Sequence, residues 1–510
     1  MKTIRLILGD QLNHAHSWFQ KVDNDVVYVM MELRQETDYV WHHIQKVTAF
    51  FAAMQSFSEE LKQRKHQVIY LQLNDAANKQ HFADNLNSLI KQHQFTHFEY
   101  QLPDEYRLDE YFKSYTSTLS ISYAAVDSEH FFSTRTELSK FFAGKKTFLM
   151  ESFYHYMRKK HHVLMDGEEP LTGKWNYDAD NRKKLPANHT PTAPLVFDND
   201  ISNILLEIQK TDIKTIGTID VNNFVWPINR KQSLVLLTFF VNECLPLFGT
   251  FQDAMTPSGW SLYHSRLSFC MNTKMLSPKE VIDTCIEAWK KRPNEIAYHQ
   301  LEGYVRQIIG WREYMRGMYW LKMPAFETEN FFDHQAKLPD WYWTGKTKMN
   351  CLKHAIGQSL NYAYAHHIQR LMITGNFALL AGTHPDEVDQ WYLGIYIDAI
   401  QWVEITNTRG MSQFADGGDI GTKPYVSSAA YIDKMSHYCK SCYYDKSKKV
   451  GDKACPFNSL YWNFYDRHTH LLSNNQRIGM MYKLWEKMAP ETKAALLEQA
   501  DYYLKRVNEL

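Results

Sequence analysis

The sequence has no excess of charge of either sign, because 57 Lys and Arg residues balance 57 Asp and Glu residues. A protein that binds nucleic acid through overall positive charge is therefore excluded, although a local basic groove is compatible with a net charge of zero. The N-terminal run MKTIRLILGDQ is too short for a signal peptide. No window reaches the apolar length of a membrane-spanning helix, so we expect a cytoplasmic protein that does not contact a membrane.

Internal repeats, low-complexity tracts and the dinucleotide-binding motif G-x-G-x-x-G are also absent. Aromatic residues, in contrast, are abundant: Phe, Trp and Tyr make up 14% of the chain. Two explanations fit this content equally: a large helical core filled with aromatic rings, or a function that uses the rings.

The first 130 residues alternate between strand-like and helix-like segments. The predicted strands are short apolar runs, at Thr3–Leu8, Val26–Met31, Val68–Leu73 and His97–Leu102. Polar segments with helical periodicity separate them, notably Tyr39–Lys65 and Asn78–His93. Strands that alternate with helices predict an open, mostly parallel, Rossmann-like α/β sheet. Gly9-Asp10-Gln11 follows the first strand, where ligands bind in such sheets, although a plain turn has the same pattern.

The remaining chain divides into a connector over 131–200 and an all-α domain over 201–510. Thr134-x-x-Glu137 in the connector resembles a capping box. Ser277-Pro278 predicts the start of a helix, and Gly382 predicts the end of another. The predicted order is thus an α/β domain, a connector and a large helical domain.

Three of the seven cysteines form a metal-binding pattern. Cys439-Lys-Ser-Cys442 is followed after twelve residues by Cys455-Pro456, and Cys351 is the plausible distant fourth ligand. In a reducing compartment such a set binds metal more often than it forms disulfides. Four thiolates suit zinc or an iron–sulfur cluster, and His437 is an alternative zinc ligand to Cys351. Cys244, Cys270 and Cys285 lie alone in apolar helical stretches and are expected to be structural.

A histidine pair lies in the segment Asn361–Leu380, which predicts a helix with Tyr362, His366 and Arg370 on one face. His367 lies about 100° around this helix. Packing with one satisfied hydrogen bond explains such a pair as readily as catalysis does.

A second helical segment, Gly303–Arg316, places Gln307, Trp311 and Tyr314 on one face beside arginines. Aromatic rings among arginines suit base stacking and phosphate binding, and a half-buried amphipathic helix has the same pattern.

These segments together resemble the iron–sulfur branch of the photolyase/cryptochrome family. WSLYHSRLS at 260–268 resembles the flavin-binding stretch of photolyases, and GWREYMR at 310–316 resembles the W-R-E helix. HHIQR at 366–370 is similar to the His-His pair of (6-4) photolyases and animal-type cryptochromes. The four cysteines resemble the ligands of the prokaryotic iron–sulfur subfamily, and this likeness favours [4Fe-4S] over zinc. The resemblance covers essentially the whole chain.

The resemblance implies three cofactors and their ligands. FAD would lie in the helical domain, against Ser265, Leu267, Ser268, Gln307, Arg312, Asp398, Glu404 and Asn407. A 6,7-dimethyl-8-ribityllumazine antenna would lie in the α/β domain near Gly9, Asp10, Gln11, Glu36 and Tyr39. A [4Fe-4S] cluster would be held by Cys351, Cys439, Cys442 and Cys455.

The function implied is light-driven repair of (6-4) photoproducts by a monomer that binds UV-damaged DNA with the lesion flipped out. His366 would be the general acid, with His367 and Tyr425 beside the lesion and Trp311 and Tyr431 as further substrate contacts.

The resemblance also implies that Trp391, Tyr392 and Trp343 carry electrons to the flavin. Two positions depart from the family pattern. Tyr314 stands where many photolyases have Phe, and Ile400 cannot act as an aromatic relay.

Two other functions remain open on the sequence. A cryptochrome-type photoreceptor would use the same cofactors for signalling, although HHIQR and the absence of a long low-complexity C-terminal tail favour repair. A zinc-stabilised nucleic-acid-binding protein would use the cysteines without photochemistry, and it would be colourless.

Overall fold

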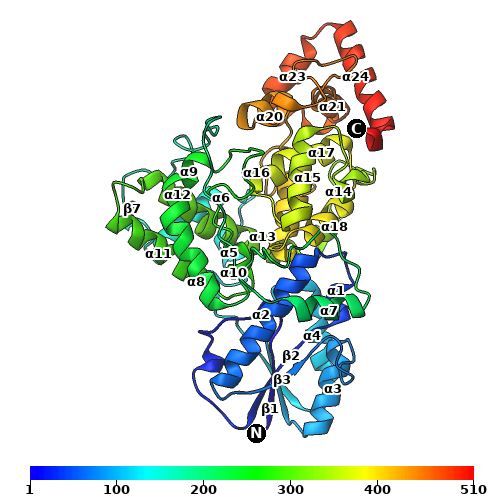
Figure 1. Cartoon of the computed structure of the whole chain (residues 1–510). Helices are drawn as coiled ribbons and strands as arrows, with labels where there is room; N and C mark the ends of the chain where they lie inside the picture. The colour runs from blue at the N-terminus through cyan, green and yellow to red at the C-terminus, as the bar shows by residue number, and fades with distance from the viewer.

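The N-terminal part is an α/β layer built on a five-stranded parallel sheet, as described by a computed structural model of residues 1–510 (Figure 1). The strand order is β3-β2-β1-β4-β5. The strands span Thr3–Leu6 (β1), Val26–Met31 (β2), Gln67–Leu71 (β3), His97–Gln101 (β4) and Ser122–Val126 (β5). Four strands and the parallel sheet were predicted from the sequence, and this fold class is confirmed. The edge strand β5 was not predicted, because its residues are half-buried or exposed and show no apolar run.

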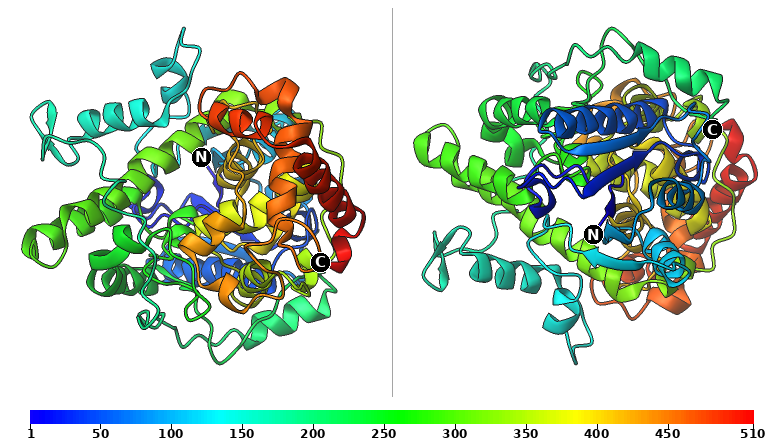
Figure 2. Two further views of the ribbon diagram at one scale, coloured as in Figure 1. Left: turned by 90° about the horizontal axis from the view of Figure 1, so that it is seen from above. Right: turned by 90° about the horizontal axis from the view of Figure 1, so that it is seen from below.

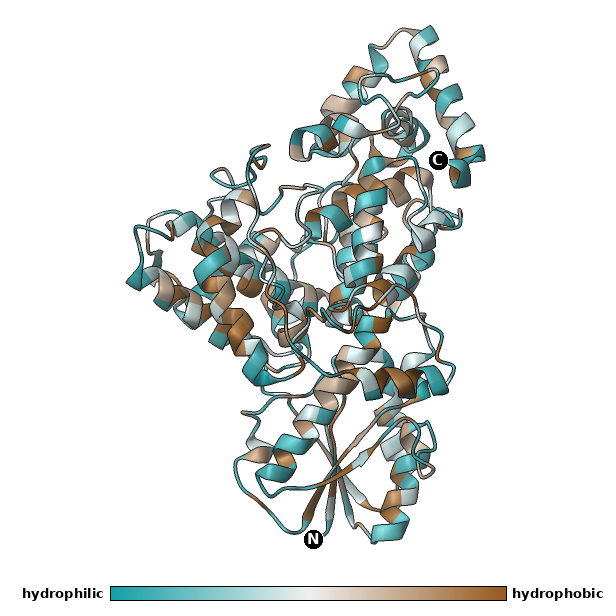
Figure 3. Ribbon diagram, viewed as in Figure 1, coloured by the Kyte–Doolittle hydropathy of each residue, from teal (hydrophilic) through white to brown (hydrophobic).

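Helices cover both faces of this sheet. They are α1 (Arg34–Thr37), α2 (Ile44–Gln63), α3 (Phe82–His93) and α4 (Tyr106–Ser117), with a 3-10 turn, η1, at Ser17–Phe19. Alternate residues of β2 point to opposite faces, as expected for a strand. Tyr28 packs in the core with α2, whereas Val29 packs in the core with α3 and α4. Strand β2 is accordingly mostly hydrophobic, whereas β4 also carries polar residues. Figure 3 shows brown segments together with paler and teal ones along the strands.

The connector contains little regular structure. Helices α5 (Glu137–Phe141) and α6 (Met150–His161) precede a short hairpin, β6 (Met165–Asp166) and β7 (Glu169–Pro170). The predicted capping box is half formed: the Glu137 carboxylate accepts from the Thr134 amide at 3.2 Å, but the residue at the helix cap is Thr136. No helix or strand lies between Pro170 and α7 (Ser202–Lys210). The domain limits at residues 130 and 200 stay a prediction.

From residue 230 onward the chain is helical. Figure 1 shows this region beyond one end of the sheet, and Figure 2 shows the same arrangement from above and from below. The α-helices of the first half are α8 (Arg230–Phe239), α9 (Leu245–Phe251), α10 (Ser268–Asn272), α11 (Pro278–Lys291), α12 (Tyr298–Val305) and α13 (Glu313–Lys322). Those of the second half are α14 (Trp341–Thr344), α15 (Asn350–Tyr362), α16 (His367–Gln369), α17 (Asn376–Ala381), α18 (Pro385–Ile395), α19 (Gln401–Ile405), α20 (Ala429–Met435), α21 (Pro456–Arg467), α22 (Thr469–Leu472), α23 (Gly479–Glu486) and α24 (Pro490–Lys505).

Four π-helical segments interrupt these helices. They are η2 (Phe240–Cys244), η3 (Arg306–Arg312), η5 (Arg370–Gly375) and η6 (Thr406–Ser412). Three 3-10 turns complete the region: η4 (Ala325–Thr328), η7 (Tyr438–Ser441) and η8 (Val507–Glu509). π-Helical turns are rare and often lie at functional sites, because the extra residue in the turn reorients side chains.

The predicted helix ends at Ser277 and Gly382 are confirmed. The Ser277 hydroxyl accepts from the Glu280 amide at 3.1 Å, and Gly382 has the left-handed φ of 74°. The single helix predicted over Asn361–Leu380 is wrong. Helix α15 ends at Tyr362, Ala363 adopts a φ of 52°, and a new helix begins after His366. Tyr362, His366 and Arg370 therefore do not share one helical face.

One helical stretch corrects the expectation that no window could cross a membrane. Arg230–Phe251 is long and apolar enough by length and composition, with a mean hydropathy of 1.7. The stretch comprises α8, η2 and α9, and it places Leu237, Phe240 and Leu245 in the hydrophobic core. A core helix of a globular protein passes the same test, so the stretch is weak support for a membrane span.

Candidate functional site

A cavity of about 1070 Å³ lies within the helical region. Three of the four π-helical segments line it: η3 through Gln307, Trp311 and Arg312, η5 through Arg370, and η6 through Asn407. The cavity is large enough for a cofactor together with part of a substrate, since pockets for small ligands span about 300–1,000 Å³.

The residues predicted to contact FAD converge on this cavity. Those that line it are Ser265, Ser268, Gln307, Arg312, Asp398, Glu404 and Asn407. Leu267 does not line the cavity, because its side chain is fully buried in the adjacent core, where it caps α10. These residues come from elements more than 100 positions apart, so the fold and not local sequence brings them together.

An ion pair between Arg370 and Asp398 forms one wall of the cavity. Two guanidinium nitrogens of Arg370 donate to the two carboxylate oxygens at 3.0 and 3.2 Å. The Ser268 hydroxyl donates to the same carboxylate at 2.6 Å. Such a bidentate pair fixes both side chains in orientation. The importance of Arg370 was not recognised from the sequence, although the residue lies within the HHIQR motif.

The guanidinium of Arg312 is buried without a carboxylate bonded to it. One of its nitrogens lies 3.3 Å from the His130 ring and 3.3 Å from the Met271 carbonyl oxygen, whereas Nε and the other terminal nitrogen have no partner. Burial lowers the pKa of Arg312 to about 10. A buried, unpaired cation is costly, so this corner of the cavity suits an anionic or strongly polar ligand.

Glu404 presents a carboxyl group in a site that disfavours its charge. Burial, with the negative charge of Asp389 next, raises the pKa of Glu404 well above its ordinary value. Its Oε1 atom is buried without a hydrogen-bond partner. A neutral carboxyl group can donate or accept a hydrogen bond, which suits the edge of a polar ring system.

The two histidines of the predicted pair lie at different depths from the cavity. His367 lines the cavity, as does His264. His366 is not part of the lining; it is 2% exposed and its ring stacks on His264, with centroids 4.6 Å apart. Burial lowers the pKa of His264 and of His367 to about 4, and it lowers the pKa of His366 well below its ordinary value. His366 is the N-cap residue of α16, with an extended backbone, and His367 is the first residue of that helix.

The aromatic residues predicted to contact substrate line the same cavity. Trp311, Tyr425 and Tyr431 all contribute, and none is fully buried. Burial, with Asp253 next, raises the pKa of Tyr431 to about 12. These rings therefore stay neutral and can stack on a base. Tyr314 does not share this face, because its ring is fully buried and its hydroxyl donates to the Phe148 carbonyl oxygen at 2.5 Å.

The residues predicted to carry electrons are placed unevenly. Tyr392 lines the cavity, and the centroids of the Trp391 and Tyr392 rings lie 5.3 Å apart. Trp391 also packs against Tyr342 and Tyr396, at 5.1 and 5.8 Å. Trp343 is 36% exposed, and its aromatic partner is Trp41 of the N-terminal layer, at 5.8 Å. Ile400 lies in the hydrophobic core beside this region.

Two of the residues predicted at an antenna site, Glu36 and Tyr39, surround Arg107. The Arg107 guanidinium pairs with Glu36 at 3.0 and 2.8 Å and lies 4.5 Å from the Tyr39 ring. Tyr39 is 40% exposed, yet burial raises its pKa well above the ordinary value.

The other predicted antenna residues lie at the end of β1. The Gln11 amide donates to the Gln101 carbonyl oxygen at 3.2 Å. Asp10 pairs with Lys274 at 3.4 Å, and burial raises the pKa of Asp10 to about 6. Gly9 allows helix α2 to approach, since an added Cβ would lie 3.0 Å from the Met54 sulfur. Both polar atoms of the Gln101 side chain are buried without partners, which suits a polar ligand.

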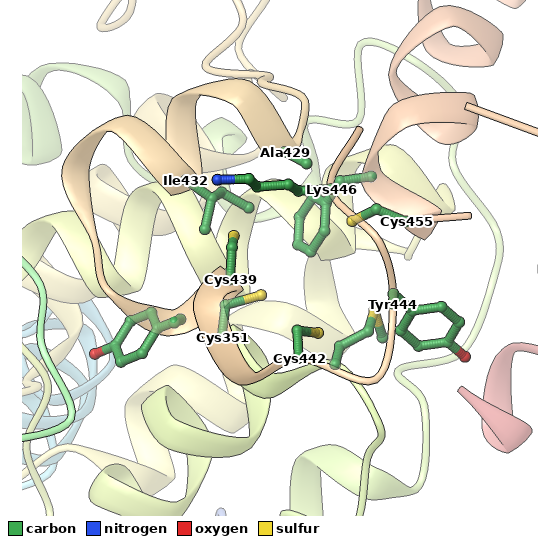
Figure 4. A pocket seen from close by; sticks show the side chains of 11 residues that line it. Cys351, Ala429, Ile432, Cys439, Cys442, Tyr444, Lys446 and Cys455 are labelled. Atoms are coloured by element: carbon green, nitrogen blue, oxygen red, sulfur yellow. The ribbon is translucent and has the colours of Figure 1, made fainter. Parts of the chain in front are cut away.

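The four cysteines of the predicted cluster line one small cavity between α15, η7 and α21 (Figure 4). Cys351 comes from the first turn of α15, Cys439 lies within the turn η7, Cys442 caps the end of that turn, and Cys455 caps the start of α21. His437 does not line this cavity, so the alternative ligand is not brought to it. Cys244, Cys270 and Cys285 are buried elsewhere in the core, as predicted.

The four cysteines of this cavity suit thiolate ligation, but their side chains are not arranged as they would be around a single metal ion. No group of three or more His, Cys, Asp or Glu side chains converges as it would around one metal ion. Burial, with the other three cysteines next, raises the pKa of Cys351 well above its ordinary value. The free thiol of Cys351 would remain protonated, and a metal centre would be needed to hold it as a thiolate.

Comparison with known proteins gives consistent results along the chain. The family described as "Deoxyribodipyrimidine photo-lyase-related protein" matches residues 5–226. The structure resembles the crystal structure of a bacterial class III photolyase from Agrobacterium tumefaciens, with a TM-score of 0.57 at 14% identity over 99% of this chain and 98% of that one. An uncharacterised protein of Acanthamoeba polyphaga mimivirus, R852, is 26% identical over 36% of this chain and 96% of its own length.

A further relative is similar over its entire length. The (6-4) photolyase of Agrobacterium fabrum is 39% identical to this chain, over 100% of both proteins. Identity at this level over the whole of both chains shows common family membership, so the protein belongs to the photolyase/cryptochrome family.

Proposed function

We propose that the protein repairs pyrimidine (6-4) photoproducts in UV-damaged DNA in a light-driven reaction. The observation that carries this proposal is the shared cavity. The residues predicted to contact FAD, apart from Leu267, line one space together with His367 and the rings of Trp311, Tyr425 and Tyr431. A flavin and a flipped-out lesion would thus be in contact within one pocket. The full-length likeness to a (6-4) photolyase supports the choice of substrate.

The flavin fits the residues present. Arg312 offers unpaired donors and Glu404 an unpaired oxygen at the cavity, and the Arg370–Asp398 pair is fixed in orientation. When bound and reduced, FAD would supply an electron on illumination. The chain's own residues would orient the ring system, exclude water from it and hold the lesion against it.

A histidine would donate the proton that the lesion needs. We propose His367 for this role, because it lines the cavity, and we assign His366 the task of supporting the cavity wall through its stack on His264. The role requires that substrate phosphates raise the pKa of His367 from about 4, which nearby negative charge does.

Two further cofactors are part of the proposal. A [4Fe-4S] cluster would be held by Cys351, Cys439, Cys442 and Cys455; their sequence spacing and their shared cavity support it. A 6,7-dimethyl-8-ribityllumazine antenna would be held near Glu36, Tyr39 and the unpaired amide of Gln101, where it would supply excitation energy.

Trp391 and Tyr392 would pass electrons inward from the surface when the flavin is oxidised, since the two rings are neighbours and Tyr392 reaches the cavity. Trp343 would be the exposed donor. The protein would act in the cytoplasm as a monomer.

The cofactors are tested by the colour and composition of purified protein. We expect FAD and a lumazine on extraction, together with iron and acid-labile sulfide in equal amounts, at about four of each per chain for a [4Fe-4S] cluster. Colourless protein with one zinc per chain would contradict the proposal. Lesion binding that leads to no repair under light would instead favour a photoreceptor.

A further inference from the structure

Helix α20 (Ala429–Met435) forms a wall shared by the cysteine cavity and the large cavity. Ala429 and Ile432 line the cysteine cavity, whereas Tyr431 lines the large cavity. Neighbouring positions on a helix point in different directions, so one short helix serves both sites. The Tyr431 ring accordingly packs against both hydrophobic cores of the helical region. A shift of this helix would alter both sites together.

One side chain ties this helix to the cysteine loop. Asn458 lies in the first turn of α21, three residues after Cys455, and is 7% exposed. Its side-chain oxygen accepts from the Ala429 amide at 3.1 Å, at the start of α20. Its side-chain nitrogen donates to the carbonyl oxygens of Lys446 and Lys448, at 2.9 and 2.8 Å. All of the hydrogen bonds of this amide thus go to backbone groups of two other segments.

The same two segments are joined a second time. The Lys446 ammonium group pairs with Asp433 of α20 at 2.6 Å, and Lys446 also lines the cysteine cavity (Figure 4). This pair is exposed to solvent and contributes little by itself. Asn458, in contrast, is buried, and its removal would leave backbone donors and acceptors without partners.

We propose that Asn458 is a positioning residue that couples the cysteine site to the substrate wall. When the cysteine site holds its metal centre, the loop from Cys442 to Cys455 is fixed, Asn458 fixes the start of α20, and Tyr431 is held against the lesion. Loss of the metal centre or of Asn458 frees α20 and weakens the binding of lesion-containing DNA, even in the dark. The inference rests on the proposed function for its substrate and for the occupant of the cysteine site.

The experiment compares Asn458→Ala with Asn463→Ala in the full-length holoprotein. Asn463 lies on the same helix, and its side-chain oxygen makes no hydrogen bond. The measurements are dark affinity for a duplex with one (6-4) lesion, amide hydrogen exchange of residues 429–435, and iron and flavin content. Asn458→Ala should bind the duplex about tenfold more weakly, as expected from the loss of a buried hydrogen-bond partner. Its residues 429–435 should exchange faster while flavin is retained, and Asn463→Ala should behave as wild type.

A second variant separates the two arms of the link. Asn458→Asp keeps an acceptor for the Ala429 amide but cannot donate to Lys446 and Lys448. In this variant the amides at the start of α20 should stay protected from hydrogen exchange, whereas the amides of residues 443–454 should exchange faster. Removal of iron from wild type should speed exchange in 429–435 as Asn458→Ala does.

Unchanged exchange of residues 429–435 in both Asn458→Ala and iron-depleted protein would overturn the coupling. If wild-type protein failed to bind the lesion duplex, the proposed function would fail instead, and the exchange measurements would still decide the coupling.

Discussion

His264 and His366 stack face to face, with ring centroids 4.6 Å apart and planes inclined by 11°. His264 lines the large cavity, and His366 supports it from behind. The stack leaves His367 as the member of the adjacent pair that can meet a substrate. We therefore propose that His367, which lines the cavity, acts as the acid.

Replacement of His367 should therefore remove repair. His367→Ala should lower the rate of (6-4) repair by about 10²–10⁴-fold, the usual contribution of a general acid, with flavin content unchanged. His366→Phe keeps an aromatic ring beside His264 and should retain most of the activity. Repair rates under continuous light, normalised to flavin, provide the measurement. Full activity in His367→Ala combined with loss in His366→Phe would reverse the assignment.

The Arg370–Asp398 pair should be needed for flavin retention. Arg370→Ala leaves the Asp398 carboxylate buried without its cation, which costs about 3–5 kcal/mol when a buried pair is broken. We expect most of the flavin to be lost on purification and the melting temperature to fall. Arg230→Ala is the matched control, since Arg230 pairs with Glu280 away from the cavity. Equal flavin content in both variants would argue against a flavin at this wall.

The four cysteines of the small cavity should be the ligands of the metal centre. Substitution of Cys351, Cys439, Cys442 or Cys455 by Ala should reduce bound iron and destabilise the fold, because metal-binding energy contributes to folding. Cys285→Ala should keep its iron, since Cys285 lies alone in the helical core. Iron and sulfide analysis decides the point. Retention of iron in Cys351→Ala would show that this distant residue is not a ligand.

Acid should destabilise the fold at a mild pH. Burial lowers the pKa of His334 and of His468 to about 3, and their Nε2 atoms lie 3.0 Å apart. Below pH 6.5 the unfolded chain binds protons that the native pair does not, so stability present at neutral pH is lost as the pH falls from 6.5 to about 3. Each such histidine contributes about 1.4 kcal/mol per pH unit.

The measurement is the free energy of unfolding in urea at several values between pH 7 and 5. A variant with Phe at both 334 and 468 should show a shallower decline than wild type. An unchanged slope would mean that these rings are not the acid-sensitive groups.

The sequence predicted the sheet well because its central strands are continuous apolar runs, as in β2. It did not predict β5, an edge strand with exposed residues. The break at Ala363 was also missed. The segment has strong helical periodicity, and tertiary contacts override it: the Ala363 carbonyl oxygen accepts from the Ile397 amide at 2.9 Å.

For the site, local spacing identified Cys439, Cys442 and Cys455, and Cys351 was identified as the plausible remaining thiol. The pairing of Arg370 with Asp398 and the layering of His264 and His366 could not be read from the sequence. They depend on how helices far apart in the chain approach each other.

The central claim is tested most directly by illumination of reduced protein with two duplexes, one with a single (6-4) photoproduct and one with a single cyclobutane dimer. Restoration of intact bases is followed by chromatography of the oligonucleotides, with dark samples as controls. We expect light-dependent restoration of the (6-4) duplex alone. Restoration of only the cyclobutane dimer, or of neither duplex in flavin-loaded protein, would contradict the claim.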